Sequence, residues 1–383
     1  MKIAFIHNDK KLGTGAHFIN DLMASRLRES GVRVKNFYPK SPLFDAPLHL
    51  RGLNNVLFFY SLLEHKDEIL KYDLIQGTTY TPLAFLPFSI PVVSHFGSTS
   101  WGFLKAVPLA KDLEPSLRKI WLSLKAEGVI RELNVRTRRP LRDVADIEKL
   151  VALRADAVIA TSDIVRKDLL EAGIPPENVY VVPNAIEDYW FGRRAAALSE
   201  NPSLIFLGRI GADVFTLILK GLDRLIDYYQ HFPSVEKHTI GITTNKELVK
   251  WCDRKIPNHH FHANLRKELI PDLLDGKAGS ILLITSRYEG FSLSLIEGMS
   301  QGLIPVTYPV GIAPEIIQNG KNGFLVHSQS EGMKAVEFLL RLPKADRGHL
   351  ATAAQETARR FHSKTISKRL IEVYDTTLKK RSK

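Results

Sequence analysis

The sequence from Ser280 to Glu297 reads S-I-L-L-I-T-S-R-Y-E-G-F-S-L-S-L-I-E. Its first six residues form an apolar run with the length and the β-branched content of a buried parallel strand. A turn at Glu289-Gly290 follows, and then Leu293, Ile296 and Met299 recur at helical spacing. The stretch therefore predicts a strand, a glycine turn and a helix in direct succession, which is the repeating pattern of a parallel α/β sheet.

A connection of this kind forms an anion-binding site at the start of the helix. The backbone N–H groups of Phe291, Ser292 and Leu293 lie at the helix start, where they lack intrahelical acceptors and the helix dipole favours negative charge. Glu289 precedes these amides, and Glu297 lies about two turns inside the helix. Two carboxylates, which only accept hydrogen bonds, suit a ligand that carries hydroxyls on both sides of its phosphates.

Apolar runs of strand length alternate with helical patterns along most of the chain. Strands are expected at residues 2–7, 32–38, 73–77, 91–97, 157–160 and 179–182, and again at 204–207, 239–243, 260–263, 280–285, 303–308 and 323–326. This alternation predicts parallel sheets with helices on both faces and ligands at the carboxyl ends of the strands. The predicted fold class is α/β, with two Rossmann-like domains.

The length of 383 residues also fits two domains. We expect a first domain at residues 1–187, with a basic helical insertion at about 98–154, and a hinge at 188–202. A second domain follows at 203–360. The last segment, 361–383, is expected to form a helix that packs back on the first domain.

Composition indicates an intracellular protein with an anionic partner. The single cysteine, Cys252, has no internal partner, which favours a reducing compartment, and no apolar run is long enough to span a membrane. The apolar run at the start of the chain, within residues 1–7, is too short for the hydrophobic region of a secretory signal, so a cytoplasmic location is expected. The net charge of +12 calls for nucleic acid, an acidic membrane surface or a phosphorylated substrate.

Much of this positive charge falls in Arg118–Arg142. Aromatic residues are sparse there, with only Trp121, so nucleic acid is the least favoured partner. The segment is interpreted either as a solvated helical face or as a surface for an acceptor or for the inner face of the plasma membrane. Trp101 and Phe103 are either core residues or an acceptor platform.

Other polar residues follow predicted strands. Gly13-Thr14-Gly15 follows the first strand and lets a ligand approach the backbone, but the third glycine and the acidic residue of an NAD site are missing. His95 ends the 91–97 strand, where a histidine can donate a hydrogen bond to a substrate. Arg209 and Lys220 supply the fork and the point charge that a diphosphate needs, although two solvated surface cations are an equal reading of this pair alone.

Three motifs resemble the donor-binding half of the family 4 glycosyltransferases, which have the two-Rossmann GT-B fold. They are E-G-F-S-L-S-L-I-E-G-M-S-Q-G-L-I-P-V at 289–306, G-I-A-P-E-I-I at 311–317 and N-G-K-N-G-F-L-V at 319–326. Two weaker matches are V-P-N-A-I at 182–186 and Gly208-Arg209, and the likeness fades before residue 150.

The resemblance implies a role for each candidate residue. Glu289 would bind the hydroxyls of the donor sugar, and Glu297 would bind the ribose hydroxyls of the nucleotide. The amides from Gly290 to Leu293 would hold the diphosphate. The nucleotide base would lie against His262–Leu265.

The same resemblance assigns the cations and the first-domain residues. Arg209 and Lys220 match the phosphate-binding pair of the family, and His95 matches its histidine near the donor sugar. The chain departs from the family pattern in three places: an apolar insertion separates Arg209 from Lys220 and leaves the position of Lys220 open, Thr14 interrupts the glycine pair that ends at Gly15, and Phe96 replaces an aspartate.

The implied activity is a retaining transfer of a hexose from a nucleotide diphosphate, a UDP-sugar, to a hydroxyl acceptor in a glycan, polysaccharide or glycolipid. No metal and no further cofactor are expected, because cations and amides of the protein would stabilise the diphosphate. A UDP-sugar epimerase of the same fold and a non-catalytic basic binding protein remain as alternatives. A glycoside hydrolase is disfavoured, because it needs both carboxylates at one sugar carbon rather than on either side of an anion site.

Overall fold

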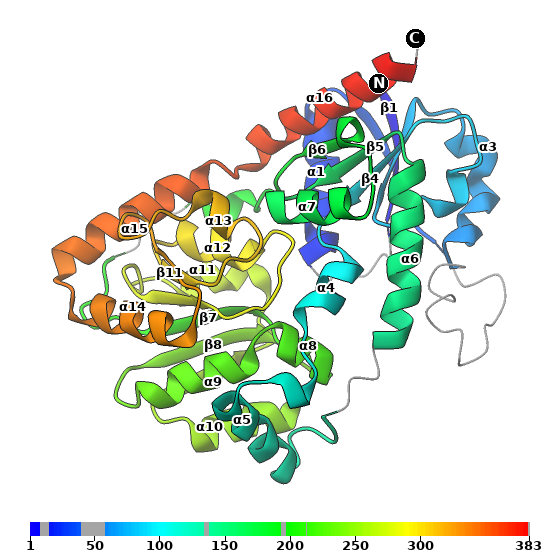
Figure 1. Cartoon of the computed structure of the whole chain (residues 1–383). Helices are drawn as coiled ribbons and strands as arrows, with labels where there is room; N and C mark the ends of the chain where they lie inside the picture. The colour runs from blue at the N-terminus through cyan, green and yellow to red at the C-terminus, as the bar shows by residue number, and fades with distance from the viewer. Residues whose placement is uncertain (8–14, 40–57, 134–137, 193–196, 212, 382–383) are drawn as a thin grey trace. The chain divides into compact units, whose positions relative to one another are not determined.

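The computed structural model (Figure 1) describes residues 1–7, 15–39, 58–133, 138–192, 197–211 and 213–381. The chain packs as two compact units. The first consists of Met1–Leu104, Thr137–Glu187 and Phe361–Lys383, and the second of Lys105–Arg136 and Asp188–Arg360.

The first unit contains a six-stranded sheet in the order β2-β1-β3-β4-β5-β6, with every pairing parallel. The strands are β1 (Lys2–Ile6), β2 (Arg33–Phe37), β3 (Leu74–Thr78), β4 (Val92–Phe96), β5 (Ala157–Ala160) and β6 (Val179–Val181). The central strands β3 and β5 are buried at every position, as expected of strands covered on both faces.

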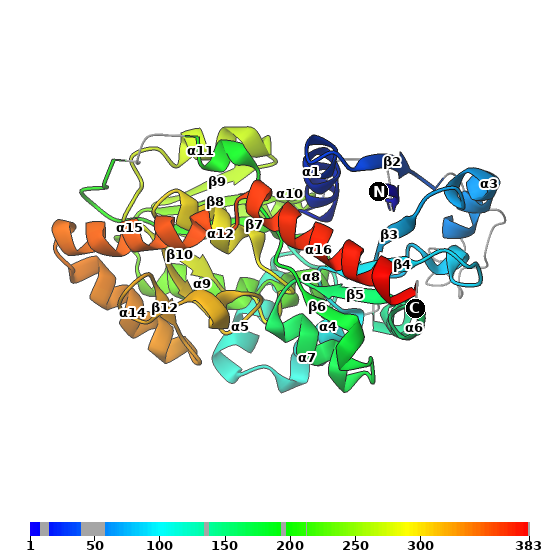
Figure 2. The same ribbon diagram turned by 90° about the horizontal axis from the view of Figure 1, so that it is seen from above.

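The helices of this unit are α1 (Gly15–Glu29), α3 (Lys66–Ile69), α6 (Arg138–Arg154), α7 (Asp163–Glu171) and α16 (Ser363–Arg381), and α4 (Ser100–Ala106) begins in it. Short 3-10 helices lie at Phe58–His65, Leu83–Phe85 and Pro176–Asn178. Helix α16 runs beside α1 (Figure 2), where Arg26 Nε donates to Ser363 Oγ at 2.8 Å. Its Tyr374 hydroxyl donates to Gln76 on β3, so the end of the chain is part of the first unit.

The second unit repeats the plan with the order β12-β11-β10-β7-β8-β9, again parallel throughout. The strands are β7 (Leu204–Arg209), β8 (Lys237–Ile242), β9 (His259–Ala263), β10 (Ile281–Ile284), β11 (Ile304–Thr307) and β12 (Phe324–Leu325). The predicted fold class of two parallel α/β sheets is therefore confirmed.

The helices of the second unit are α5 (Pro115–Ala126), α8 (Val214–Leu219), α9 (Leu222–His231), α10 (Lys246–Lys255), α11 (Ile270–Leu273), α12 (Leu293–Ser300), α13 (Ala313–Ile316), α14 (Gln329–Arg341) and α15 (Lys344–Arg359). Three 3-10 helices lie at Ala110–Asp112, Asp188–Trp190 and Lys267–Leu269. Trp190, in the segment expected to be a hinge, is 1% exposed, and its carbonyl accepts a hydrogen bond from Gln301 at 2.8 Å.

The basic insertion expected at 98–154 does not pack as one piece. Residues 105–136 belong to the second unit, where α5 lies against α9 (Figure 1). One face of α5 is apolar and buried, with Trp121 fully enclosed. Beyond the helix, Asn245 donates to the Val129 carbonyl at 3.1 Å, and Glu127 pairs with Arg254 at 2.8 Å. The position of this segment between two strands of the first domain predicts that it belongs to that domain. Its apolar face is instead buried in the second unit.

Candidate anion-binding site at the carboxyl edge of the second sheet

The connection between β10 and α12 has an unusual backbone. Strand β10 is buried throughout, and the loop after it leaves the sheet at its carboxyl edge. Ser292, the residue before α12, has a φ of 73°, in the left-handed region that costs a non-glycine residue about 1–3 kcal/mol. Its hydroxyl is buried, and within the described part of the chain nothing bonds to it. Strain and an unpaired buried hydroxyl at one residue mark this helix start as a candidate ligand site.

Two glycines fix this connection in place. At Gly298 in α12 an added Cβ would lie 2.6 Å from Leu282 Cδ2, so the helix packs closely on β10. Gly311 has a φ of 55°, and an added Cβ there would clash with the Phe291 carbonyl oxygen, at a distance of 2.5 Å. Its amide donates to the Glu289 carbonyl at 3.0 Å. The loop after β11 therefore packs against the turn that leads into α12.

Glu289 lies beside a cation and a hydroxyl. Lys220 Nζ is 2.6 Å from Glu289 Oε1, and Ser286 Oγ donates to the same oxygen at 2.7 Å. The side chains of Lys220 and Glu289 are 23% and 17% exposed, so the pair is partly shielded from water but within reach of a ligand. A carboxylate has about four lone-pair directions, which leaves acceptor capacity for hydroxyls of a sugar.

The position of Lys220, left open by the sequence, is decided by how the insertion folds. The inserted residues form α8, whose first turn is capped by Asp213 and whose apolar side chains are buried. At Gly221, φ is 65° and an added Cβ would lie 2.0 Å from the Thr285 carbonyl oxygen. Thr285 Oγ1 donates to the Lys220 carbonyl at 2.9 Å. The extra helix therefore returns the chain to the loop after β10, and Lys220 lies on Glu289.

Glu297 has its own cation. Lys267, in the loop after β9, places Nζ 2.7 Å from Glu297 Oε1, and the two side chains are 14% and 7% exposed. A buried carboxylate needs a partner to stay charged. Glu297 lies within the predicted motif, whereas Lys267 is thirty positions earlier in the sequence and no motif joins the two residues.

Arg209 ends β7 and Leu265 follows β9, the two strands that flank β8 in the second sheet. Arg209 is the exposed last residue of β7, and an added Cβ at Gly208 would lie 3.9 Å from Ser294 Oγ, so this strand end is next to the start of α12. Leu265 is 36% exposed in the loop after β9. The neighbouring Asn264 has a φ of 58° and accepts a hydrogen bond from the Thr243 amide at 3.0 Å.

A buried ion pair also anchors the loop after β10, and the sequence does not predict it. Arg287 donates to both Asp223 carboxylate oxygens at 2.8 and 2.7 Å and to the Ile218 carbonyl at 2.7 Å. The Asp223 side chain is 0% exposed and that of Arg287 is 7% exposed. The pair ties the loop after β10 to α8 and α9. Arg287 lies inside the motif that indicated the site, but its partner is 64 residues away.

The remaining candidates, His95 and Gly15, belong to the first unit. His95 lies near the end of β4, half-buried, and lines a narrow cavity with Gln76 and Asn184. Burial lowers the pKa of His95 to about 4, so the ring is neutral at pH 7. Gly15 is the first residue of α1, while Gly13 and Thr14 lie outside the described residues.

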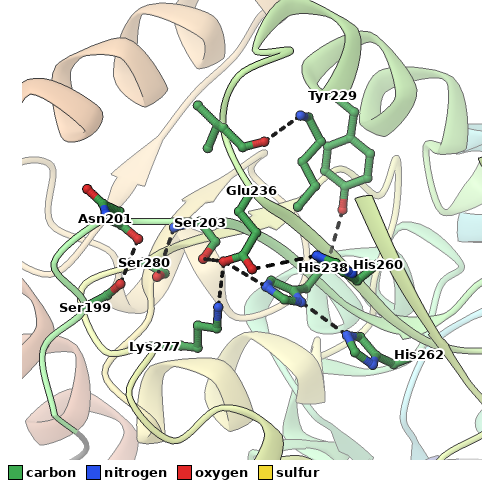
Figure 3. Close-up of polar contacts among 12 residues, drawn as sticks. Ser199, Asn201, Ser203, Tyr229, Glu236, His238, His260, His262, Lys277 and Ser280 are labelled. Carbon is green, nitrogen blue, oxygen red and sulfur yellow. Dashed lines mark hydrogen bonds and ion pairs between the residues drawn. The ribbon is translucent and has the colours of Figure 1, made fainter. Parts of the chain in front are cut away.

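The second unit also contains a histidine cluster, centred on Glu236 at the amino end of β8 (Figure 3). Glu236 lies 2.7 Å from Lys277 Nζ and 3.2 Å from His238 Nε2, and His238 Nδ1 is 3.1 Å from His262 Nε2. His262, expected near a nucleotide base, is therefore bonded within this cluster. In the part of the chain that the structure describes, no group of three or more His, Cys, Asp or Glu side chains is arranged to hold a metal ion.

The basic and aromatic surface residues divide between the units. On α5, Arg118, Lys119 and Lys125 are exposed beside Leu122, which is 49% exposed. Trp101 packs against Phe96 and donates to the Asp168 carbonyl at 3.3 Å, which favours the core reading of this residue over the acceptor platform. No helix among the described residues is long and apolar enough to cross a membrane.

Two protein families match this chain. Residues 21–188 match the family described as Glycosyltransferase Family 4, and residues 194–359 match the family described as Glycosyl transferases group 1. An uncharacterized 41.2 kDa protein in the cps region of Klebsiella pneumoniae is 26% identical over 237 residues, or 58% of this chain and 60% of that protein. The alpha-maltose-1-phosphate synthase of Mycolicibacterium smegmatis is 25% identical over 223 residues, or 51% of this chain and 54% of that protein. The matches thus span between half and two thirds of these curated relatives.

Solved structures share the fold along the whole chain. A sucrose-phosphate synthase from Thermosynechococcus elongatus has a TM-score of 0.73 at 15% identity, covering 98% of both chains. Anabaena HepE in complex with UDP and glucose has a TM-score of 0.66 at 20% identity, covering 98% of this chain and 100% of that one. At these identities the likeness concerns the fold.

Proposed function

Since the chain belongs to the family 4-like glycosyltransferases with the GT-B fold, we propose that it transfers a hexose from a UDP-sugar to a hydroxyl acceptor with retention of configuration. The observation that carries this proposal is the arrangement around α12. Glu289 and Glu297 flank the helix start at Ser292, and each carboxylate is paired with a lysine. The site thus offers acceptors for hydroxyls on both sides of an anion-binding turn.

In the proposed complex, the Ser292 and Leu293 amides receive the diphosphate, and Arg209 and Lys220 neutralise it. Glu289 accepts hydrogen bonds from the sugar hydroxyls, and Glu297 accepts them from the ribose. UDP is the proposed carrier, with support from Anabaena HepE, a structural neighbour solved with UDP and with UDP-glucose.

Transfer would need no nucleophile from the protein. The bond between the sugar C1 and the diphosphate oxygen breaks, the acceptor oxygen bonds to C1 on the same face, and the hydroxyl proton passes to the departing phosphate. The protein would act mainly by stabilising the charge that develops on the diphosphate. His95, with its lowered pKa, would act as a neutral hydrogen-bond donor to the sugar. Because protein cations hold the diphosphate, excess EDTA should leave the activity intact.

The acceptor is proposed to be a glycan, a polysaccharide or a lipid-linked sugar. The exposed basic residues of α5, with Leu122 among them, would contact an acceptor or an anionic membrane surface. Liposome flotation with and without anionic lipid tests this part of the proposal, and Arg118→Glu together with Lys119→Glu should abolish any binding.

Donor binding is tested by calorimetry and thermal denaturation with UDP and UDP-hexoses. UDP should raise the melting temperature, because a ligand that binds only the native state stabilises it. Glu297→Ala should weaken UDP binding, whereas Glu289→Ala should lower turnover and leave UDP affinity nearly unchanged. Unaltered UDP binding by Glu297→Ala would contradict the ribose role.

The two alternatives give different results in the same experiments. An epimerase would release a new UDP-sugar in the absence of an acceptor, which product analysis detects. A basic binding protein would show no stabilisation by any nucleotide diphosphate.

A further inference from the structure

Lys267 occupies a position that no candidate motif covers. It opens the 3-10 helix Lys267–Leu269, just after the loop that follows β9. Leu265, two residues earlier, is exposed in that loop, while the Lys267 side chain is only 14% exposed. The chain therefore turns the lysine inward at the strand end where, under the proposed function, the nucleotide lies.

The inward lysine links two elements of the site. Lys267 Nζ lies 2.7 Å from Glu297 Oε1, which joins the loop after β9 to α12. Glu297 is 7% exposed, so without a cation its charged form would be strongly disfavoured. The carboxylate can form this ion pair with Lys267 and still accept a hydrogen bond from a ligand hydroxyl, because it has about four lone-pair directions.

We propose that Lys267 is a positioning residue for the nucleotide: it keeps Glu297 charged and oriented so that the carboxylate can select ribose over 2′-deoxyribose. This inference rests on the proposed function, since it assumes that Glu297 receives ribose hydroxyls. Lys267 acts through Glu297 and lies just after the β9 loop, on the side of the site where the nucleotide base is proposed to bind. It is distinct from Lys220, which lies on the sugar side of the same site at Glu289.

The test measures affinity for UDP and for 2′-deoxy-UDP by calorimetry. The full-length variants are Lys267→Met, Lys267→Arg, Glu297→Gln and the double variant Lys267→Met/Glu297→Gln. Lys250→Met serves as the control, because Lys250 forms a surface pair with Glu247 in the same unit, with both side chains more than half exposed. The native protein and the control should prefer UDP by tenfold or more.

Lys267→Met should lower the affinity for UDP by about 10-fold to 100-fold, which is the scale of one charge-assisted hydrogen bond. The affinity for 2′-deoxy-UDP should fall much less, so the preference for UDP over 2′-deoxy-UDP should disappear. Lys267→Arg should keep part of the preference for UDP. The double variant should bind UDP as Glu297→Gln does, because removing the carboxylate leaves the lysine nothing to position.

Equal or tighter UDP binding by Lys267→Met would overturn the inference and show that Lys267 competes with the nucleotide. Independent, additive losses in the double variant would also overturn it. If Lys267→Met fails to fold, the comparison of Glu297→Gln with the double variant still decides, because neither contains the unpaired carboxylate. Failure of the native protein to bind UDP at all would instead refute the proposed function.

Discussion

Replacing Gly311 by alanine should distort the proposed anion-binding turn without changing any charged residue. Gly311 has a φ of 55°, and a Cβ there would lie 2.5 Å from the Phe291 carbonyl oxygen and 3.1 Å from the Ser292 nitrogen. Ordinary contact begins near 3.4 Å, so the turn must move by the difference between 3.4 and 2.5, about 0.9 Å. A shift of that size takes the Ser292 amide out of hydrogen-bonding range of a phosphate.

The expected losses can be separated by a matched control. Gly320 has a φ of 74°, but nothing lies within 4 Å of an added Cβ. Gly320→Ala should therefore cost only the left-handed backbone, about 1–2 kcal/mol. Gly311→Ala adds overpacking of about 1–3 kcal/mol. It should also lose one charge-assisted hydrogen bond to the diphosphate, about 1.5–3 kcal/mol, or about 10-fold to 150-fold in UDP affinity.

Urea denaturation measures the stability difference, and calorimetry with UDP measures the affinity. Gly320→Ala should bind UDP as the native protein does. If Gly311→Ala also keeps native UDP affinity while it is destabilised as expected, the amides of this turn do not hold the diphosphate.

Three further variants test groups around the two units. Arg287→Met should destabilise the second unit by about 3–5 kcal/mol in urea denaturation, because it leaves Asp223 charged and buried, whereas Arg287→Met/Asp223→Leu should recover most of the loss. Burial, and after it the neighbouring histidines and Lys237, lower the pKa of His259 from 6.5 to about 4. Between these pH values the unfolded chain binds a proton that the folded chain does not bind, so stability is lost as pH falls from 6.5 towards 4, by up to about 1.4 kcal/mol per pH unit. His259→Gln should flatten this slope, while exposed His327→Gln should leave it unchanged. Burial raises the pKa of Glu148 to about 7 from 4.5, so the first unit should lose stability as pH rises between these values, and Glu148→Gln should remove that loss; an unchanged profile would contradict it.

The sheets were predictable because most strands are short apolar runs bounded by glycine, proline or polar residues, whereas β2 and β9 carry more polar residues. Every predicted run overlaps an observed strand, with ends that differ by at most two residues. The carboxylates Glu289 and Glu297 were predictable for a similar reason, since one strand, one turn and one helix place both of them.

Long-range partners were not predictable in this way. In the pairs Lys267–Glu297 and Arg287–Asp223, one residue outside the α-helices meets a helix that is distant in the sequence, and no local pattern records that contact. The position of Lys220 depended on whether the inserted residues formed a bulge or a helix. These residues fold as α8 because their apolar side chains pack in the interior of the second unit, which the length of the insertion does not reveal.

The placement of residues 105–136 affects how this protein can be recombined with its relatives. The chain passes from one unit to the other at 104/105, 136/137, 187/188 and 360/361, and only one of these junctions lies at the expected hinge. A chimera joined there would pair α5 from one parent with α9 from the other, across the interface that encloses Trp121. An exchange of the second unit between relatives would therefore require that α5 be transferred with it, as a separate piece of sequence.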